Sequence, residues 1–242
     1  LPVLGHLPRL PEASIESRHL GLKTAGEIAG LQQKIALLAD ALVLDWVQFQ
    51  ALTDRPAPQA QPAARAPART RIAVAQDEAF CFAYAETLEA LTAAGAELVP
   101  FSPLHDAVLP PELGGLYLPG GYPELYAGPL SENRSMRASV RQAVEHGLPT
   151  VAECGGFLYL GQSLTDAEGQ SWPMAGVLPG EAKDAGRLVR FGYAALSADS
   201  DSLLFRAGES FPIHEFHHWD STANGTALAA KKPVGGAEWQ IG

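Results

Sequence analysis

One stretch of the chain, residues 148 to 160, restricts the fold more than any other. It reads Leu-Pro-Thr-Val-Ala-Glu-Cys-Gly-Gly-Phe-Leu-Tyr-Leu, which is a short apolar strand, then Cys154, two glycines and an apolar helix. This pattern is typical of a nucleophile elbow, a strained strand-to-helix turn that projects one side chain above a sheet. A helix N-terminus behind such a turn lowers the pKa of a thiol and favours the thiolate. Cys154 is therefore the candidate nucleophile, although most lone cysteines are simply buried.

A candidate base lies downstream, where residues 211 to 220 contain three histidines and two carboxylates. On a strand, His214 and Phe216 would lie on one face, and Glu215 and His217 on the other. Only one face can meet Cys154. A metal site is one alternative, but adjacent side chains on a strand point apart and no helical H-E-x-x-H spacing occurs. Solvated surface histidines are another alternative, and an imidazole that activates the thiol is the favoured interpretation.

A glycine-rich loop supplies a third element. Residues 114 to 125 read Gly-Gly-Leu-Tyr-Leu-Pro-Gly-Gly-Tyr-Pro-Glu-Leu, an apolar strand that ends in Pro-Gly-Gly. Backbone N–H groups freed in such a loop could stabilise an oxyanion, although a plain tight turn is the commoner use of Gly-Gly. All three segments follow predicted strands, and open α/β sheets bind their ligands at the carboxyl ends of strands. This coincidence favours a functional site.

The second part of the chain alternates strands with helices. We expect strands over residues 71–75, 97–101, 115–118 and 150–152, and helices over residues 84–95 and 136–147. This rhythm predicts an α/β fold with an open, mostly parallel sheet and helices on both faces. Residues 175 to 211 carry short strand signals and are expected to be antiparallel at an edge of the sheet.

The first part of the chain has a different pattern. Residues 20 to 50 have apolar side chains at helical spacing, which predicts a helix that faces a core through Ile28, Leu31, Ile35, Leu38, Leu42 and Val43. Residues 54 to 69 are rich in proline and alanine and poor in large apolar side chains, as in a linker. We therefore expect a domain boundary at a linker over 54–69, with a first part over 1–53 and a second domain over 70–242.

Composition narrows the classes of partner and the compartment. The chain has 17 Lys and Arg against 27 Asp and Glu, and a pI near 5.1. This acidic balance argues against nucleic acid or an anionic membrane surface as a partner. Cys81 and Cys154 are far apart and give no disulfide framework, which favours a cytoplasmic protein. The sequence also shows neither a signal peptide nor an apolar run long enough to span a bilayer.

Three motifs resemble those of a known family. The segments 118–124, 152–156 and 214–217 are similar, in order and spacing, to the class I glutamine amidotransferase domain of the cobyrinic (or hydrogenobyrinic) acid a,c-diamide synthases. Residues 2–9 and 17–22 resemble the end of that family's ATP-dependent synthetase domain. The resemblance therefore covers nearly the whole chain. Only this resemblance of residues 2–9 and 17–22 implies that the first part, over 1–53, is a fragment of a second α/β domain.

The resemblance implies a reaction and roles for particular residues. Cys154 would attack the side-chain amide of glutamine, which releases ammonia and forms a glutamyl thioester that water hydrolyses. His217 would be the base that accepts the thiol proton and later protonates the leaving amine. Backbone N–H groups of the loops at Gly120, Gly121 and Gly155 would bind glutamine and its oxyanion.

Several other residues are candidates for supporting roles. Tyr122 and Glu124 follow the Gly-Gly loop and could hold it in place. Glu215 and Asp220 could orient the imidazole, but a strand would turn Asp220 to the opposite face. Arg187 and Arg190 could contact a glutamine carboxylate, yet exposed arginines are common on strands, so neither is a predicted site residue.

The resemblance also implies partners and cofactors of a complete enzyme. Such an enzyme would use ATP and Mg²⁺ to amidate the a and c carboxylates of cobyrinic or hydrogenobyrinic acid, a corrinoid substrate, while the glutaminase domain would bind neither metal nor cofactor. The chain has no G-x-x-x-x-G-K-[ST] loop, starts without methionine and ends before the family's closing segment, so we expect a fragment. It departs from the family at Ile213, where glycine is usual, and at residues 218–221. A homodimer, a glutaminase serving another ligase and a non-catalytic binding module remain open.

Overall fold

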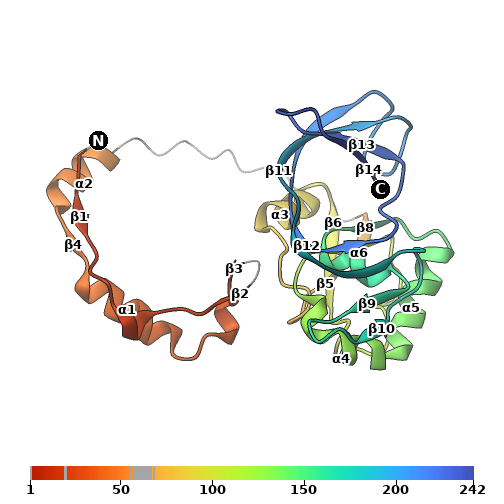
Figure 1. Ribbon diagram of the computed structural model, residues 1–242, viewed down its shortest axis with the longest axis horizontal. Coiled ribbons are helices and arrows are strands. Elements are labelled where there is room, and N and C mark those ends of the chain that lie inside the picture. Colours follow the sequence, from red (N-terminus) through yellow and green to blue (C-terminus); the bar gives the residue numbers. More distant parts are fainter. Residues whose placement is uncertain (1, 19–20, 55, 57–66, 68) are drawn as a thin grey trace. The chain divides into compact units, whose positions relative to one another are not determined.

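The chain divides into two compact units, Leu1–Ala63 and Ala64–Gly242 (Figure 1). The computed structural model describes residues 2–18, 21–54, 56, 67 and 69–242. The division falls inside the predicted linker, of which residues 55, 57–66 and 68 lie outside the described part. Each unit is therefore described by itself.

The first unit consists of short elements. Strand β1 (Gly5–His6) pairs antiparallel with β4 (Val43–Leu44), and β2 (Ser17–Arg18) with β3 (Gly21–Leu22). The helices are the 3-10 helices η1 (Pro11–Ala13) and η2 (Ala25–Glu27), and the α-helices α1 (Leu31–Ala41) and α2 (Trp46–Thr53).

The helix expected over residues 20–50 is wrong in two respects. The segment is broken, because Gly30 adopts a left-handed φ of 66° before α1, and the Asp45 side chain accepts the Gln48 N–H at 3.0 Å to begin α2. The apolar side chains also lack a core: Ile35 is 48% exposed and Val43 is 56% exposed. Helical spacing predicted α1 correctly, but spacing cannot show what covers an apolar face.

The second unit contains a parallel sheet with the strand order β6-β5-β7-β8. Its strands are β5 (Thr70–Ala75), β6 (Ala96–Phe101), β7 (Gly115–Leu118) and β8 (Thr150–Ala152). The accompanying helices are α3 (Ala85–Ala93), η3 (Pro123–Tyr126), α4 (Ala127–Glu132), α5 (Arg134–Glu145) and α6 (Gly155–Leu160). The predicted α/β class with a parallel sheet is confirmed.

The strand order places three loops together. Strand β6 lies on one side of β5, and β7 and β8 lie on the other, so the chain reverses its direction of travel through the sheet at β5. Loops at the carboxyl ends of strands on either side of such a switch point form the ligand crevice of open α/β sheets. The loops that follow β5, β7 and β8 meet at this edge.

A second sheet follows in the chain and has the order β10-β9-β11-β13-β14, with β12 paired to β11. Its strands are β9 (Ser163–Thr165), β10 (Ser171–Pro173), β11 (Glu181–Ala198), β12 (Ser210–Ser221), β13 (Leu228–Lys231) and β14 (Glu238–Ile241). It is mostly antiparallel, as predicted for this region. Among its described strand pairs, only β9 and β11 run parallel. Figure 1 shows β11 and β12 as a long curved pair, which we call the β11/β12 ribbon.

A single hydrophobic core joins the two sheets. Leu118 of β7, Tyr159 of α6, Leu164 of β9 and Trp219 of β12 all belong to it. The Trp219 indole N–H also donates to the Thr165 carbonyl at 2.7 Å, so the carboxyl end of the ribbon is fixed beside β9. Burial of side chains of this size stabilises the fold by about 1.5–3 kcal/mol each.

Candidate active site

Cys154 lies at the turn between β8 and α6, in the geometry that the sequence predicted. Its φ is 49° and its ψ is −114°, a conformation that residues with a side chain rarely adopt. The turn is held by a hydrogen bond from the Glu153 N–H to the Leu118 carbonyl (3.0 Å) and by one from the Leu158 N–H to the Cys154 carbonyl (3.1 Å). Strain of this kind costs about 1–3 kcal/mol and persists where the surroundings enforce it.

Glycines allow the loops around Cys154 to approach one another. A Cβ on Gly156 would lie 2.1 Å from the Leu118 carbonyl oxygen, and one on Gly121 would lie 2.0 Å from the Ala79 carbonyl oxygen. Both neighbours are backbone atoms and cannot rotate away. The loops after β5, β7 and β8 are therefore in direct backbone contact, which no other residue type would permit.

The predicted oxyanion residues also lie at the thiol. A Cβ on Gly120 would lie 3.7 Å from the Cys154 sulfur, and the backbone N–H groups of Gly121 and Gly155 lie close enough to the thiol to lower its pKa. The structure thus places Gly120, Gly121 and Gly155 around Cys154. Their role in binding an oxyanion stays a prediction.

The expected low thiol pKa is wrong. Burial among protein atoms raises the pKa of Cys154 above its ordinary value, although part of the residue is exposed to solvent. The N–H groups of Gly155 and Gly121 act in the opposite direction, while the Glu124 and Glu153 carboxylates raise the pKa further. The short helix α6 does not outweigh this desolvation, so the protein as described favours the neutral thiol.

The two supports predicted beside the Gly-Gly loop are buried. Tyr122 is 1% exposed, and its ring packs edge-on against Phe82 with the ring centroids 5.0 Å apart. Glu124 is 5% exposed and lies in the 3-10 helix η3. A further contact, which no sequence motif indicated, is a hydrogen bond from the Tyr117 hydroxyl to the Glu153 carboxylate at 2.6 Å.

The predicted alternation along β12 is confirmed. Phe216 and His214 are exposed on the outer face, whereas Trp219 is 7% exposed and belongs to the core. Glu215 and His217 share the inner face with Trp219, and their side chains are 15% and 20% exposed. Of the three histidines in this segment, His217 is therefore the one that alternation places on the inner face.

Both ring nitrogens of His217 face oxygen atoms. The Nδ1–H donates to the Trp219 carbonyl oxygen at 2.7 Å, because a carbonyl can only accept. Nε2 lies 3.6 Å from Glu215 Oε1. Burial opposes the charged ring, but Glu215 and the Trp219 carbonyl outweigh it and raise the pKa of His217. This arrangement favours the imidazolium, which can protonate a leaving amine but must lose a proton before it can act as a base.

Arg190 of β11 is a site residue that the sequence reasoning missed. Its Nη2 donates to Asp220 Oδ1 at 2.6 Å, and its Nε lies 3.4 Å from Glu215 Oε1. Asp220 therefore reaches the same guanidinium as Glu215, contrary to the expectation that it would point away. Strand alternation failed here because β11 is irregular, and two glycines with a positive φ, Gly186 at 67° and Gly192 at 101°, were the sequence signals of that irregularity.

The structure builds two clusters rather than one continuous dyad. Cys154 is gathered with the three glycines, and His217 with Glu215 and Arg190. Within the described part of the chain, no hydrogen bond or ion pair joins the Cys154 thiol to the His217 ring. Activation of the thiol by His217 therefore stays a prediction.

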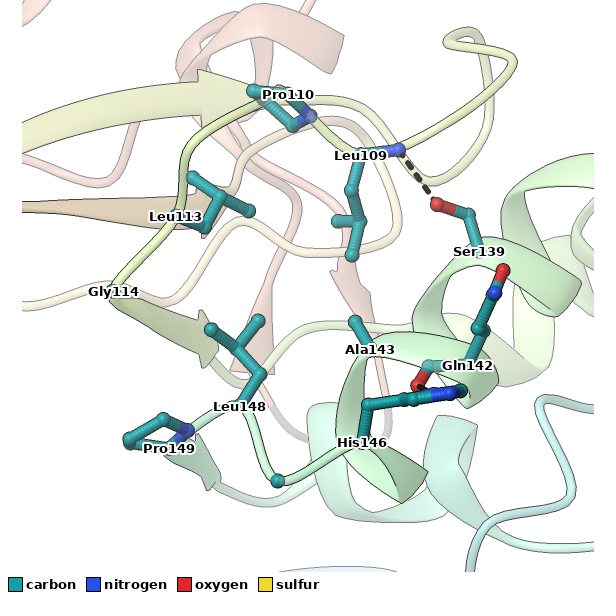
Figure 2. Close-up of a pocket in the computed structure, with 11 residues that line it drawn as sticks. Leu109, Pro110, Leu113, Gly114, Ser139, Gln142, Ala143, His146, Leu148 and Pro149 are labelled. Atoms are coloured by element: carbon teal, nitrogen blue, oxygen red, sulfur yellow. Dashed lines mark hydrogen bonds between the residues drawn. The ribbon is translucent and has the colours of Figure 1, made fainter.

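A cavity of about 550 Å³ lies at a different place in the fold (Figure 2). It is bounded by the loop before β7 and by the second half of α5, and Figure 2 shows Leu109, Leu113 and Leu148 directed into it. Gly114 and Pro149, which also line it, directly precede β7 and β8. The cavity is therefore at the amino ends of these strands, whereas Cys154 follows the carboxyl end of β8.

Three observations concern ligands and compartment. Among the described residues, no three or more His, Cys, Asp or Glu side chains are grouped so that they could hold a metal ion. Cys81 and Cys154 are both free thiols. No helix in the described ranges has the length and apolar character needed to cross a bilayer.

Comparison with known families decides the relationship. Residues 71–238 match the model of the CobB/CobQ-like glutamine amidotransferase domain, which is more than half of the chain. The chain belongs to this family. The resemblance drawn from the three motifs is thus confirmed, and the second unit is a glutamine amidotransferase domain.

Several relatives of this amidotransferase share one name. The cobyrinate a,c-diamide synthase of Synechocystis sp. is 41% identical over 235 residues, which are 92% of this chain and 47% of that protein. The cobyrinate a,c-diamide synthase of Caldanaerobacter subterraneus is 38% identical over 248 residues, which are 100% of this chain and 55% of that protein. That of Salmonella typhimurium is 40% identical over 242 residues, which are 97% of this chain and 52% of that protein. The chain spans about half the length of these relatives.

A solved structure is also similar to this chain. It is described as the structure of PurLQS from Thermotoga maritima, with 16% identity and a TM-score of 0.47 over 71% of this chain and 86% of that one. This likeness is too weak to support a conclusion.

Proposed function

We propose that this amidotransferase domain hydrolyses glutamine with Cys154 as the nucleophile and delivers ammonia for the amidation of a corrinoid acid. The observation that carries the proposal is the position of Cys154, at a strained elbow beside Gly120 and near the backbone N–H groups of Gly121 and Gly155, which act to lower its pKa. An acyl-transfer site needs this combination of a projected nucleophile and fixed donors.

The reaction would proceed through a thioester. The Cys154 thiolate attacks the side-chain amide carbon of glutamine, and the N–H groups of Gly121 and Gly155 stabilise the tetrahedral oxyanion. The oxyanion collapses, the carbon–nitrogen bond breaks, and the His217 imidazolium donates a proton to the departing amine. Water then attacks the thioester, giving glutamate and restoring the thiol.

The proposed mechanism requires an adjustment of the site. Burial raises the pKa of the Cys154 thiol, and His217 is held between Glu215 and the Trp219 carbonyl, which raise the pKa of its ring. Transfer of the thiol proton requires a neutral His217 ring that reaches the sulfur. We infer that bound glutamine, or the rest of the enzyme, brings the two clusters together.

The acceptor and the use of ATP are proposed from the relatives' names. The part of those proteins that this chain does not cover would hold the site that activates a carboxylate of cobyrinic or hydrogenobyrinic acid. The present residues do not fit ATP and Mg²⁺, since the sequence lacks a phosphate loop of the G-x-x-x-x-G-K-[ST] type and the described part has no acidic metal cluster. No step of the mechanism above involves ATP.

The first unit supports the proposal of a separate synthetase domain. Within its described residues only Ala13 is buried, whereas Trp46, Val47 and Leu52 of α2 are 61%, 78% and 49% exposed. Apolar side chains exposed in such number mark a surface that other protein covers. We propose that this unit is the end of the synthetase domain, that residues 54–69 link it to the amidotransferase domain, and that the enzyme works in the cytoplasm.

Trapping of the thioester tests the proposed function. The protein is incubated with glutamine, quenched in acid and digested, and the Cys154 peptide is examined by mass spectrometry for a glutamyl adduct. We expect the adduct in the natural protein and in Cys81→Ser, the matched control, and none in Cys154→Ser. Glutamate formation that persists in Cys154→Ser would contradict the proposal.

One rival function is favoured by a specific observation. The raised thiol pKa, together with the separation of Cys154 from His217 into two clusters, is what a non-catalytic binding module would show. Such a module would give no adduct even when joined to the synthetase half. A glutaminase that serves another ligase would give the adduct but would not support amidation of a corrinoid acid.

A further inference from the structure

The β11/β12 ribbon contains an irregularity beside His217. Between the pairs Val189–His217 and Gly192–Glu215, β11 has two residues where β12 has one, so the ribbon has a bulge at this point. Arg190 lies in the bulge with a φ of 48°, a left-handed conformation that normally selects glycine. An arginine is retained here against this backbone preference, so the position requires an explanation.

Lys232 holds the bulge from the neighbouring strand. It follows β13, and its ammonium group donates to the carbonyl oxygens of Arg190 (3.1 Å), Phe191 (2.6 Å) and Tyr193 (3.3 Å). An ammonium group has three donors, and all three are used on carbonyls of this short segment. The same group lies 5.6 Å from the centroid of the Trp239 ring, which favours a cation at that place.

The bulge directs the Arg190 side chain at the carboxylates beside His217. Its guanidinium contacts Asp220 at 2.6 Å and Glu215 Oε1 at 3.4 Å. The same oxygen, Oε1, lies 3.6 Å from His217 Nε2. Arg190 and His217 therefore share one carboxylate oxygen, and the position of Glu215 is set by both cations.

We propose that Arg190 is the positioning residue of His217, acting through Glu215, and that Lys232 sets the position of Arg190 by holding the bulge. This role rests on the proposed function of His217. Neither residue is catalytic, because Arg190 reaches the imidazole through a carboxylate and Lys232 reaches Arg190 through its backbone.

The charges around His217 give the direction of the effect. The groups that face its ring are Glu215, from its own strand, Arg190 from β11 and the Trp219 carbonyl. The positive charge of Arg190 lowers the pKa of His217, and the Arg190 guanidinium also pairs with the Glu215 carboxylate. Without the guanidinium, the Glu215 carboxylate would pair with His217 only, so the pKa of the imidazole should rise further.

Proton NMR of the histidine ring signals in the full 242-residue chain tests the proposal, with His217 assigned by its loss in His217→Asn. The pKa of His217 should rise in Arg190→Gln and, in the same direction but less, in Lys232→Met. Arg190→Lys, which keeps a cation without the planar fork, should fall between natural protein and Arg190→Gln. Lys231→Met is the matched control, because Lys231 is exposed and pairs with Glu238, and it should leave His217 unchanged.

The double variant decides whether the two residues act in series. If Lys232 works through Arg190, then Arg190→Gln combined with Lys232→Met should give the same His217 pKa as Arg190→Gln alone. Shifts that add would show that Lys232 acts independently, and an unchanged pKa in Lys232→Met would overturn its role. If the spectral dispersion shows that Arg190→Gln is unfolded, the His217 pKa is compared in the same way between Arg190→Lys and Arg190→Lys combined with Lys232→Met.

Kinetics separate this proposal from the proposed function. Lys232→Met should lower kcat for glutamine hydrolysis by up to about 10²-fold and leave KM nearly unchanged, as expected when a catalytic group is misplaced. A merely structural role would lower the amount of folded protein but not the pKa of His217. If His217→Asn retains full turnover while the NMR shifts appear, the assignment of the base fails and the positioning by Arg190 stands.

Discussion

The elbow at Cys154 and the β11/β12 ribbon at His217 are held in place by different forces. At the elbow, backbone touches backbone, and Gly121 and Gly156 leave no room for even one added carbon. On the ribbon, His217 is held by one hydrogen bond to the Trp219 carbonyl and by side-chain charges, namely Glu215 and, through it, Arg190. Close backbone packing resists rearrangement, whereas an ion-pair network can exchange partners. We therefore infer that the adjustment proposed to bring the two clusters together takes place on the ribbon.

The two faces of the ribbon provide the largest expected effect. His217→Asn should reduce glutamine hydrolysis about 10²–10⁴-fold, because a general acid-base group is lost from the inner face. His214→Asn removes an imidazole from the outer face of the same strand and should change the rate less than about twofold. Rates are measured in this chain, or with the synthetase half joined if the chain alone has no turnover. Equal losses in both variants would remove the distinction between the faces.

Added volume at the elbow tests whether backbone packing fixes it. Gly156→Ala should lower the free energy of unfolding by about 3 kcal/mol, because the new carbon meets the Leu118 backbone. Gly128→Ala is the control, since its Cβ would make an ordinary contact with the Trp172 ring at 3.4 Å and alanine favours the helix α4. Urea denaturation measures both. If Gly156→Ala were as stable as Gly128→Ala, the backbone at the elbow could move to accommodate the added carbon, and close packing would not fix it.

The charge network on the ribbon predicts a pH dependence of stability. The pKa of His217 is raised above 6.5 in the folded protein, so the protonated ring adds to the free energy of unfolding. This added stability is fully present below pH 6.5 and is lost as the pH rises through the folded-state pKa. Glu215→Gln removes a group that raises this pKa, so the variant should lose less stability than the natural protein between about pH 6 and about pH 8. Urea midpoints at the two pH values measure the difference. A larger loss in the variant would mean that Glu215 does not stabilise the imidazolium.

The smallest effect is expected on the outer face of the ribbon. Tyr193 is 72% exposed, and its ring packs edge-on against His214 at 5.1 Å between centroids. Tyr193→Ser should change the free energy of unfolding by less than about 0.5 kcal/mol, as is usual for an exposed position. Thermal denaturation checks this value. A large loss would show that the outer aromatic rings, as well as the inner charges, hold the ribbon.

The same contrast explains which parts of the site the sequence revealed. The elbow is encoded in consecutive residues, and the strands at 115–118 and 150–152 have the predicted bounds, because glycines and apolar runs act locally. Alternation likewise placed Glu215 and His217 on one face. Arg190 and Asp220 could not be placed, because a bulge breaks the alternation and Lys232, which holds it, is distant in sequence. The thiol pKa was misjudged because desolvation depends on packing that no local pattern records.

The exposed apolar surface of the first unit shows a similar limit. Helical spacing identified α1, but the residues expected to face a core, such as Ile35 and Val43, are exposed within their unit. Periodicity reports which side chains share a face and not what that face contacts. The surface that covers it lies beyond what local spacing can predict.

Alkylation of Cys154 by iodoacetamide, followed against pH with and without glutamine, tests the central claim most directly. Without glutamine, we expect Cys154 to react with an apparent pKa above the ordinary thiol value of 9.0. Glutamine should slow the alkylation of Cys154 and leave that of Cys81 unchanged, because the proposed function places the glutamine amide at Cys154. An alkylation rate at Cys154 that is indifferent to glutamine, in this chain and with the synthetase half joined, would contradict the account.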